Sequence, residues 1–565
     1  MSSAHPAAPP ESPDSEHPSS VASLRVNQAI LLAAATDGNQ SALDGLIRIT
    51  PHEEIEELLT TPPIVEGGLG CSYLHIAIES GHAGIARLIL DSLREPSVVI
   101  NQLTRTDNIS GENVFHIACH RGGTDIVPYL MKRLPSDMHA DYLASVTATN
   151  ESALGLATRA GSDGIVDYLM GKLPSDSERW AAICHTNNEG ITSFHQAAKY
   201  GQARLLNEYQ SVCRRVGQQN AFLFLSDNEG DTVLHHAMKN AQTPDKDYRR
   251  SAKIILDLAS SVNCKKSVLE ILNKEGLTPL HIATQVHQSA VELLLDETDD
   301  IESYVMMPAS QDGKTALHSA VDNGNIHALK ALFKQLPSGQ NFFKCVNAKT
   351  TDGCQSTLLQ LAAEQDTGAF QFVLNSLNQN DRYKALRYED RNGNTALLRA
   401  AIAGNWSIIK YLLEATWIQD NEYFSILTPR NDFGWSIIHL AVLQRAGDEL
   451  TSAVIRLLSS LPRMQMSRYL MHADRNGNTA LHLAALLHQP QSIRMMIKGL
   501  SHRDAQLLLN KTNTDGLTAA KLVGMTEAVI VKYLKPLTDY KWPQSYLSHK
   551  RSDVGYDQIT QALLL

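Results

Sequence analysis

The sequence predicts an all-α solenoid of about thirteen helix-turn-helix repeats, joined by short hairpin-like finger loops. The first observation is a phrase of the form G-x-T-x-L-H-x-A, which returns as GLTPLHIA ending at Ala283 and GNTALHLA ending at Ala484. The second is its period, because successive copies lie 37 to 46 residues apart. Such a period marks similar units that stack and share a core. We therefore expect the 565 residues to form one quasi-linear array instead of three or four globular domains.

The histidine of this phrase is an anchor that aligns all the copies. The thirteen anchor positions are Leu32, His75, His116, Gly155, His195, His235, His281, His318, Gln360, Leu398, His439, His482 and Lys521. Alanine lies two residues after the anchor in twelve copies, and Val523 is the exception. A small side chain at this point lets a neighbouring helix approach closely.

Each repeat is expected to begin with a capped helix. Three residues before the anchor, twelve of the thirteen copies carry a residue able to cap a helix, such as Ser72, Asn113 or Thr278. These side chains accept a hydrogen bond from an early backbone N–H of the helix. Pro279 stands in the first turn, where proline is tolerated. The Leu, Phe or Ile that follows then enters the core.

A glycine is expected to end this first helix in a left-handed conformation. These glycines are Gly81, Gly122, Gly161, Gly201, Gly324 and Gly404. A second apolar helix follows, as in IARLIL over 85–90 and IIKYLL over 408–413. After the second helix, the segments that start at Leu134, Leu173 and Leu377 predict a turn and a short extra helix.

Turn-forming residues between the repeats predict tight finger loops. Asp-Arg-Asn-Gly starts at Asp390 and Asp474, and Asn-Glu-Gly starts at Asn188 and Asn228. Asp, Asn and Gly are the residues that such turns favour. The predicted unit is therefore a finger loop, a first helix, a turn and a second helix.

Some copies depart from the pattern. A polar insertion at 243–250 separates the two helices of one repeat, and Gly353 lies two residues too far from Thr357. The first copy, from Gln28, lacks the capping Thr and the His, and the last copy has Val523 where Ala is expected. Atypical end repeats are typical of solenoids, because their outer faces meet water.

The recurring phrase resembles the ankyrin repeat, whose signature includes T-P-L-H-x-A, over about residues 27–535. The resemblance implies that the eight anchor histidines bond to Thr and to the backbone of adjacent loops. They are then structural residues, because successive anchors lie on different repeats and do not converge on one ion. The ankyrin period is about 33 residues, whereas this chain averages near 40. The extra helix would hold the surplus residues.

Three segments are expected along the chain. Residues 1–25 are rich in Ser, Pro and Ala and are predicted to be a disordered tail. Residues 26–535 form the repeat array, and residues 536–565 form either a C-terminal cap or a tail. The first segment resembles the Ser/Pro-rich leaders of bacterial type III effectors, and long-period ankyrin arrays recur in proteins that intracellular bacteria inject. An injected effector is therefore one hypothesis for this chain.

Composition excludes several classes of partner and location. A net charge of -10 argues against a nucleic-acid partner, which needs a concentrated positive field. Seven scattered cysteines without a CxxC pair indicate a reducing compartment. No apolar run reaches the roughly 18 residues of a membrane span, and the N-terminus lacks a secretory signal. We expect a cytoplasmic monomer, located in the host cytoplasm if a bacterium injects it.

The sequence predicts no enzyme, cofactor or metal site. Asp390 and Asp474 begin a stretch like an EF-hand loop, but the twelfth position is Ala401 or Ala485 where calcium binding needs Glu. Phosphate-binding, hydrolase, zinc-protease and kinase signatures are missing. About 26 N-terminal and 30 C-terminal residues lie outside the repeats, too few for a separate enzyme domain. The alternative is a host-modifying effector enzyme with catalytic residues embedded in irregular repeats.

The predicted function is a scaffold that binds partner proteins through its concave face and finger loops. Exposed aromatic residues are favoured anchors in such interfaces. We therefore predict partner contacts at Phe433, Trp435, Trp406 and Tyr200, although Trp406, like Trp417, could instead cover a helix end. The basic cluster of Tyr248, Arg249, Arg250 and Lys253, with Lys265 and Lys266, is interpreted as a solvated face.

Overall fold

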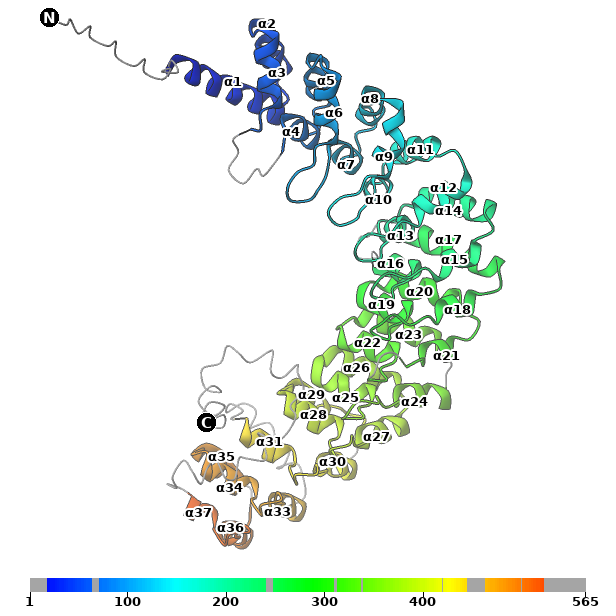
Figure 1. The fold of residues 1–565 in the computed structure, drawn as a ribbon. Coiled ribbons are helices and arrows are strands. Elements are labelled where there is room, and N and C mark those ends of the chain that lie inside the picture. Colours follow the sequence, from blue (N-terminus) through cyan, green and yellow to red (C-terminus); the bar gives the residue numbers. More distant parts are fainter. Residues whose placement is uncertain are drawn as a thin grey trace, which may run out of the picture. The chain divides into compact units, whose positions relative to one another are not determined.

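The computed structural model describes residues 18–63, 71–239, 247–308, 312–336, 339–418, 420–444, 463–498 and 500–522. These parts of the chain are all-α, with isolated extended bridges such as that between Thr106 and Asn113. They belong to two compact units, one within residues 1–268 and the other within residues 269–565. Each unit is a stack of similar repeats, in which neighbouring helices lie side by side (Figure 1). The predicted all-α repeat architecture is confirmed.

The first helix of each repeat begins where the capping residue predicts, except in the first repeat, which lacks that residue. These helices are α1 (Pro18–Asp37), α4 (Tyr73–Glu79), α7 (Val114–His120), α10 (Ala153–Arg159), α13 (Ser193–Lys199), α16 (Val233–Lys239), α19 (Pro279–Val286), α22 (Ala316–Asp322), α25 (Leu358–Gln365), α28 (Ala396–Ala403), α31 (Ile437–Leu443), α34 (Ala480–Leu486) and α37 (Ala519–Leu522). Ser72, Asn113 and Thr278 cap α4, α7 and α19, and Pro279 stands in the first turn. The predicted caps are confirmed.

A second helix runs back beside the first. The second helices are α2 (Gln40–Ile49), α5 (Ala83–Ser92), α8 (Ile126–Arg133), α11 (Asp163–Lys172), α14 (Ala203–Arg215), α17 (Asp247–Ser261), α20 (Gln288–Asp296), α23 (Ile326–Gln335), α26 (Thr367–Ser376), α29 (Trp406–Leu413) and α35 (Pro490–Lys498). The turn between the two helices uses a left-handed glycine, as predicted, with φ of 80° at Gly81 and 74° at Gly404. Other side chains rarely adopt this conformation.

A third, short helix follows the second and accounts for the long period. The third helices are α3 (His52–Thr60), α6 (Pro96–Thr104), α9 (His139–Ala144), α12 (Asp176–Ile183), α15 (Gln219–Phe224), α18 (Lys265–Leu269), α21 (Ile301–Val305), α24 (Gln340–Val346), α27 (Gln379–Arg387), α30 (Asp420–Leu427), α33 (Arg463–Leu470) and α36 (His502–Asn510). A 3₁₀ turn, η1 (Ser136–Met138), precedes α9. The extra helix predicted for a few repeats therefore recurs in both units.

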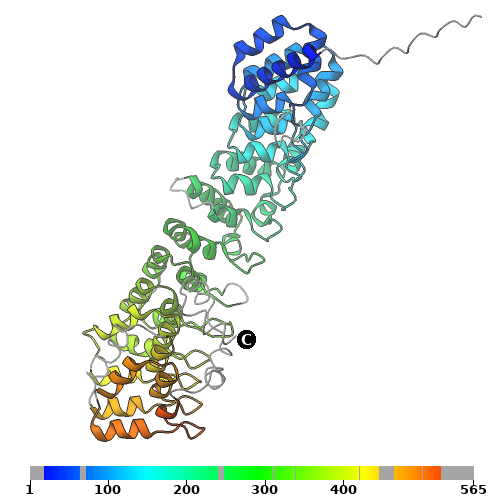
Figure 2. The same ribbon diagram turned by 90° about the vertical axis from the view of Figure 1, so that its left-hand side faces the viewer.

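The finger loops are joined from repeat to repeat by backbone hydrogen bonds. Within unit 1, the N–H of Asn188 donates to the carbonyl of Thr149 at 2.9 Å, and the N–H of Asn228 donates to Glu189 at 2.9 Å. Unit 2 continues the same pattern, for example from Thr514 to Asn476 at 3.0 Å. Figure 2 shows loops in the C-terminal part of unit 2 projecting from one side of the helix stack. These bonds fix the position of each finger on the preceding one.

Small side chains on the first helices allow the repeats to pack closely. The alanine two residues after the anchor is fully buried in most repeats, as at Ala77, Ala197, Ala320 and Ala484. Leucine, isoleucine and phenylalanine side chains of the second helices complete a continuous apolar layer. A larger residue at the alanine positions would push neighbouring first helices apart.

The two ends and the irregular repeats differ from the simple pattern. Helix α1 begins at Pro18, so its first residues lie inside the 1–25 segment expected to be a disordered tail. Residues 1–17, the polar insertion at 240–246 and residues 523–565 lie outside the described residues. The unusual spacing between Gly353 and Thr357 does not shift the start of α25, because Thr357 caps this helix in the standard way. No helix of the described chain is long and apolar enough to cross a membrane.

Candidate functional site

The anchor histidines hold one repeat to the next. In the repeat of α19, Nδ1 of His281 lies 2.7 Å from the Thr278 hydroxyl, and Nε2 lies 3.3 Å from the carbonyl of Lys314 in the following finger. A carbonyl oxygen can only accept, so Nε2 carries the proton and Nδ1 accepts from the cap. His75 and His116 make the same pair of contacts. The bonding pattern implied by the resemblance is confirmed.

One group of acidic and histidine side chains resembles a metal site. Within the described residues, Asp227, Asp231 and His236 are close enough to hold one ion. However, Nε2 of His236 lies 2.8 Å from Asp227, and the Lys239 ammonium pairs with Asp231. Although burial acts to raise the pKa of Asp227, the His236 ring and backbone N–H groups hold it at about 2. Protein donors thus already neutralise these carboxylates, and the group closes its finger loop.

A second charged group lies between two repeats of unit 2. The Arg399 guanidinium of α28 donates to Asp390 at 2.7 Å and to the Ser356 hydroxyl at 2.9 Å, and it pairs with Glu364. All three charged side chains are at most 4% exposed. From the sequence we expected Asp390 to begin a finger turn and not to bind calcium, and this network was not predicted. The signal was an arginine directly after the anchor position, on a buried helix.

The predicted aromatic finger contains one buried and one accessible ring. The side-chain oxygen of Asn431 accepts from the N–H groups of Phe433 and Trp435, at 3.1 and 3.0 Å, and so closes the loop. Trp435 is only 3% exposed, so our expectation of an exposed tryptophan is wrong. Its ring stacks on the half-buried Phe433, with centroids 4.9 Å apart. The Arg475 guanidinium lies over the Phe433 ring, 5.5 Å from its centroid.

The other two predicted contact residues lie elsewhere. Trp406 starts α29 and is half-buried, packing against the apolar cluster that includes Ile438 and Ala441. Tyr200 belongs to unit 1, where it caps the end of α13 and is 41% exposed. The Lys199 ammonium lies 5.9 Å from its ring centroid. The structure therefore brings Phe433 and Trp435 together within unit 2, and Tyr200 belongs to unit 1.

Equivalent finger positions show why Phe433 is unusual. The residue two places after the loop-closing Asn or Asp is polar in most fingers, as at Glu189, Glu229 and Asn476. Among the described fingers closed in this way, it is a large apolar residue at Phe433 and at Ile109. Ile109 is 70% exposed. We did not predict Ile109 as a contact residue, because its finger holds no aromatic residue. An alignment of the fingers would have shown it as an apolar residue at a mostly polar position.

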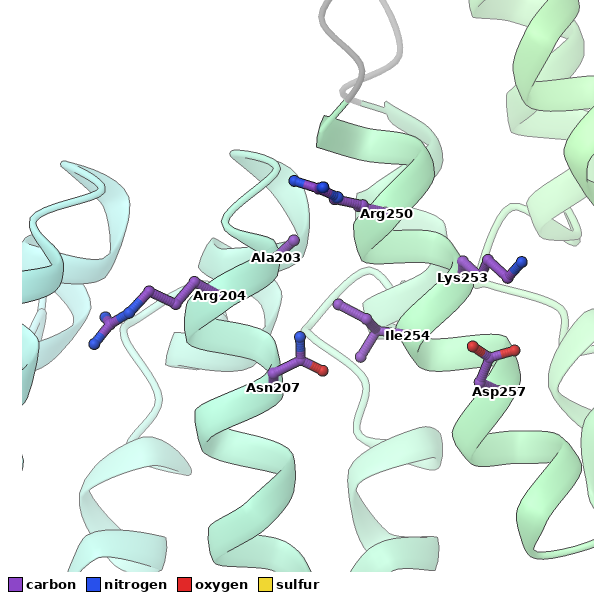
Figure 3. Close-up of a pocket in the computed structure, with 7 residues that line it drawn as sticks. All are labelled: Ala203, Arg204, Asn207, Arg250, Lys253, Ile254 and Asp257. Atoms are coloured by element: carbon purple, nitrogen blue, oxygen red, sulfur yellow. The ribbon is translucent and has the colours of Figure 1, made fainter.

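A pocket of about 430 Å³ opens between α14 and α17 in unit 1 (Figure 3). Ala203 and Ile254 face it from the two helices, and Arg250 and Lys253 supply positive charge. The basic cluster that we interpreted from the sequence as a solvated face therefore contains both buried and exposed side chains. Tyr248 is only 4% exposed, whereas Arg250 and Lys253 are exposed beside the pocket.

Comparison with known proteins identifies the repeat. Residues 74–181 and 250–342 match the family described as Ankyrin repeats (3 copies), and residues 392–420 match the family described as Ankyrin repeat. Over 135 residues, 24% of this chain, the sequence is 29% identical to the nuclear factor NF-kappa-B p105 subunit of Gallus gallus. Over 119 residues, 17% of this chain, it is 35% identical to NF-kappa-B inhibitor zeta of Homo sapiens. The matched regions span 12% and 16% of these relatives.

Proposed function

Because this chain contains ankyrin repeats, we propose that it is a protein–protein interaction scaffold that binds partner proteins through its finger loops. The observation that carries the proposal is the accessibility of large apolar side chains at a finger position that is polar in most fingers, since Ile109 is exposed and Phe433 is half-buried. Phe433 and Ile109 occupy this position, and neither is needed to close its loop. Apolar groups held in water in this way favour partner contact.

Rigid fingers make such a surface effective. Each finger is closed by its own Asn or Asp and is bonded to the preceding finger, as Arg475 N–H is to the Phe433 carbonyl at 2.9 Å. A surface that is already ordered loses little conformational freedom when it binds. The name of one relative, NF-kappa-B inhibitor zeta, describes action on another protein, which agrees with a binding role.

The arrangement of titratable groups supports a scaffold over the enzyme alternative. Anchor histidines bond to their caps, as at His195 and His318, and His195 also bonds to the carbonyl of Leu225. Burial lowers the pKa of His195 and His318 to about 4. Such rings are neutral near pH 7 and are engaged inside the repeat frame. Arg399 and its carboxylate partners are likewise buried between repeats. These groups stabilise the fold, and the finger loops remain as the proposed partner-binding surface.

The finger proposal is tested with a partner captured from a lysate of the source cells and then purified. Phe433→Ala combined with Arg475→Ala should lower affinity for that partner by about tenfold or more, because both exposed groups form one contact surface. Leu507→Ala is the matched control, since Leu507 is 54% exposed on a third helix. The change to alanine at Phe433 should leave the urea unfolding midpoint nearly unchanged, whereas Trp435→Ala should lower it.

Unchanged affinity in the Phe433→Ala, Arg475→Ala double variant would remove this finger from the interface. Equal weakening in Leu507→Ala would show that the effect is not specific to the finger. In either case, the measurements of partner affinity and urea unfolding are repeated with Ile109→Ala, which tests the second apolar finger.

We also propose that residues 1–25 direct injection into a host cell, which would make the chain a bacterial effector acting in host cytoplasm. The support is the Ser, Pro and Ala content of this segment. A reporter fused to residues 1–25 should leave bacteria that carry an injection system. Retention of the reporter in the bacterium contradicts the proposal.

A further inference from the structure

The pocket between α14 and α17 arises because α17 begins unusually early. Leu205 and Leu206 of α14 are buried, as are Ile255 and Leu256 at the corresponding place on α17. Helix α14 starts two residues before its pair, whereas α17 starts at Asp247, eight residues before its pair. The additional turns of α17 carry Arg250 past the start of α14, where the small Ala203 leaves space (Figure 3).

The pocket is mainly aliphatic with cations at its edge. Ala203 and Ile254 offer methyl and methylene groups between the helices, and the stem of Arg250 extends this apolar lining, whereas Lys253 points away from α14 (Figure 3). Long basic side chains commonly cover apolar surface while their charged heads stay in water. Asn207 and Asp257 line the same pocket farther along the two helices. The space therefore suits a ligand with a short aliphatic stem and a negative end.

The positive charge at this pocket is not balanced as it is on the neighbouring helix. Arg204, in the first turn of α14, points away from the pocket (Figure 3). It pairs with Asp167 at 2.6 Å, Asp163 at 3.3 Å and Glu208 at 3.9 Å. Among the described residues, no ion pair involves Arg250 or Lys253. Arg250 also lies in the first turn of α17, where the helix dipole disfavours a cation.

These features single out a local site on an acidic protein. The chain has a net charge of -10, so an acidic peptide would be repelled by most of its surface. Two cations that form no ion pair among the described residues, one of them unfavourably placed in the first turn of its helix, are better explained by an external anion. A dianionic phosphate is less suitable than a carboxylate, because Asp257 lines the pocket and Asp163 and Asp167 lie beside Arg204.

We propose that this pocket binds a glutamate side chain from an acidic segment of the partner protein. The two methylene groups of glutamate would lie against Ala203 and Ile254, and its carboxylate would pair with Arg250, while Lys253 adds positive charge from the far side of α17. This inference rests on the proposed scaffold function and adds a charge preference to it. The site lies within unit 1 and is independent of the aromatic finger in unit 2.

The test uses the full chain with isotopically labelled isoleucine methyl groups. Acetyl-hexaglutamate amide is added, and the Ile254 methyl signal is followed by NMR after assignment through Ile254→Val. We expect a saturable shift that weakens as salt is added, because the contact is electrostatic. The neutral probe acetyl-hexaglutamine amide, which has the same length, should leave the signal in place.

Matched variants separate the pocket from general charge. Arg250→Gln with Lys253→Gln should weaken the binding of acetyl-hexaglutamate by about tenfold or more. Lys410→Gln removes one cation from an exposed position on another second helix, α29, and should change binding less than about twofold. All substituted side chains are exposed, so the urea unfolding midpoints should stay close to that of the unsubstituted chain.

Three outcomes overturn the proposal. The first is an Ile254 signal that does not move at saturating peptide, and the second is an equal shift in the Arg250→Gln, Lys253→Gln variant. The third is tighter binding of inorganic phosphate than of the glutamate peptide, which would make the pocket a phosphate site. If the captured partner still binds through Phe433 while the peptide fails, the scaffold proposal stands and only the pocket proposal falls.

Discussion

Gln360 reveals what the anchor position requires. It replaces histidine in the repeat of α25, where its side-chain oxygen accepts from the N–H of Thr357 at 2.7 Å and its amide donates to the carbonyl of Tyr388 at 2.9 Å. An anchor that bonds from the cap to the next loop must therefore offer an acceptor and a donor, which the apolar anchors Gly155 and Leu398 do not. A neutral histidine with its proton on Nε2 meets both needs. A doubly protonated ring cannot, because Nδ1 would then be a donor.

This requirement predicts that acid weakens the array. Burial lowers the pKa of His195 and His318 to about 4 and that of His439 to about 3. The unfolded chain, whose histidines titrate near 6.5, then binds more protons than the folded chain. The stability from these histidines is complete above pH 6.5 and is lost as pH falls toward 4. At pH 5, each should contribute about 2 kcal/mol less than at pH 7.

The measurement is urea unfolding at pH 7 and pH 5, followed by circular dichroism. His195→Gln should reduce the loss of stability between the two pH values, since glutamine makes both bonds without titrating. His195→Leu is the control, and it should be less stable than His195→Gln at pH 7 because it leaves buried polar groups unpaired. An identical pH dependence in His195→Gln and the unsubstituted chain would contradict this account.

At the level of single residues, the sequence predicts the caps and the histidine contacts but misplaces Trp435. The position after the finger glycine is buried at Ile191, Asp231, Asn394 and Asn478 as well as at Trp435. Residue type alone suggests that a tryptophan in a loop is exposed. Comparison of equivalent positions would have indicated the opposite, because the repeat sets burial more strongly than the residue does.

Among the elements, the finger loops depend most on exact backbone geometry. Gly190 has φ of 78°, and a Cβ atom there would lie 2.7 Å from the backbone nitrogen of Asn228 in the next finger. That nitrogen is the donor of the bond between the two fingers. Glycine is thus required for the turn and also for the close approach of the following repeat.

Gly190→Ala should therefore be more destabilising than the same change where only the turn is affected. Gly217 is the matched control, because it has φ of 71° but no described atom within 4 Å of the added methyl. Gly217→Ala should lower the free energy of unfolding by about 1–2 kcal/mol, and Gly190→Ala by about 1–3 kcal/mol more. Urea unfolding of both variants checks the difference, and equal losses would disprove the clash.

The third helix was predictable in outline from the polar, often Pro-led segments after the second helix. Its presence throughout both units follows from the period, since every repeat has residues beyond the ankyrin length. The early start of α17 was not predictable in this way. Residues 247–252 read as part of a polar insertion, and their helical state depends on burial of Tyr248 and Ala252 in the repeat.

For the whole molecule, two compact units replace the single array suggested by uniform anchors. Anchor spacing reports local repeats, so it carries no information on where contacts between repeats become fewer. Within each unit, a repeat contacts mainly its neighbours. Stability is then a sum of repeat and interface contributions, and a local defect need not unfold the chain.

Arg399→Met tests this locality. It leaves Asp390 and Glu364 as buried carboxylates without their cation and should lower the local free energy of unfolding by about 3–5 kcal/mol. Hydrogen exchange should accelerate in α25 and α28, while α7 and α10 in unit 1 keep their rates. Adding Glu364→Gln should recover part of the loss, because burial already raises the pKa of Glu364. Accelerated exchange throughout both units would contradict independent behaviour.

The hydrogen bonds between fingers also affect how the repeats respond to a pulling force. Within a unit, consecutive fingers are joined by a backbone hydrogen bond, as between Asn188 and Thr149 in unit 1 and between Thr514 and Asn476 in unit 2. A force drawn along the stack would load these links in series, so the weakest repeat would yield while its neighbours stayed folded. One released repeat of near 40 residues supplies roughly 130–145 Å of slack. Under force, such a chain would lengthen in steps of similar size as its repeats unfold one at a time.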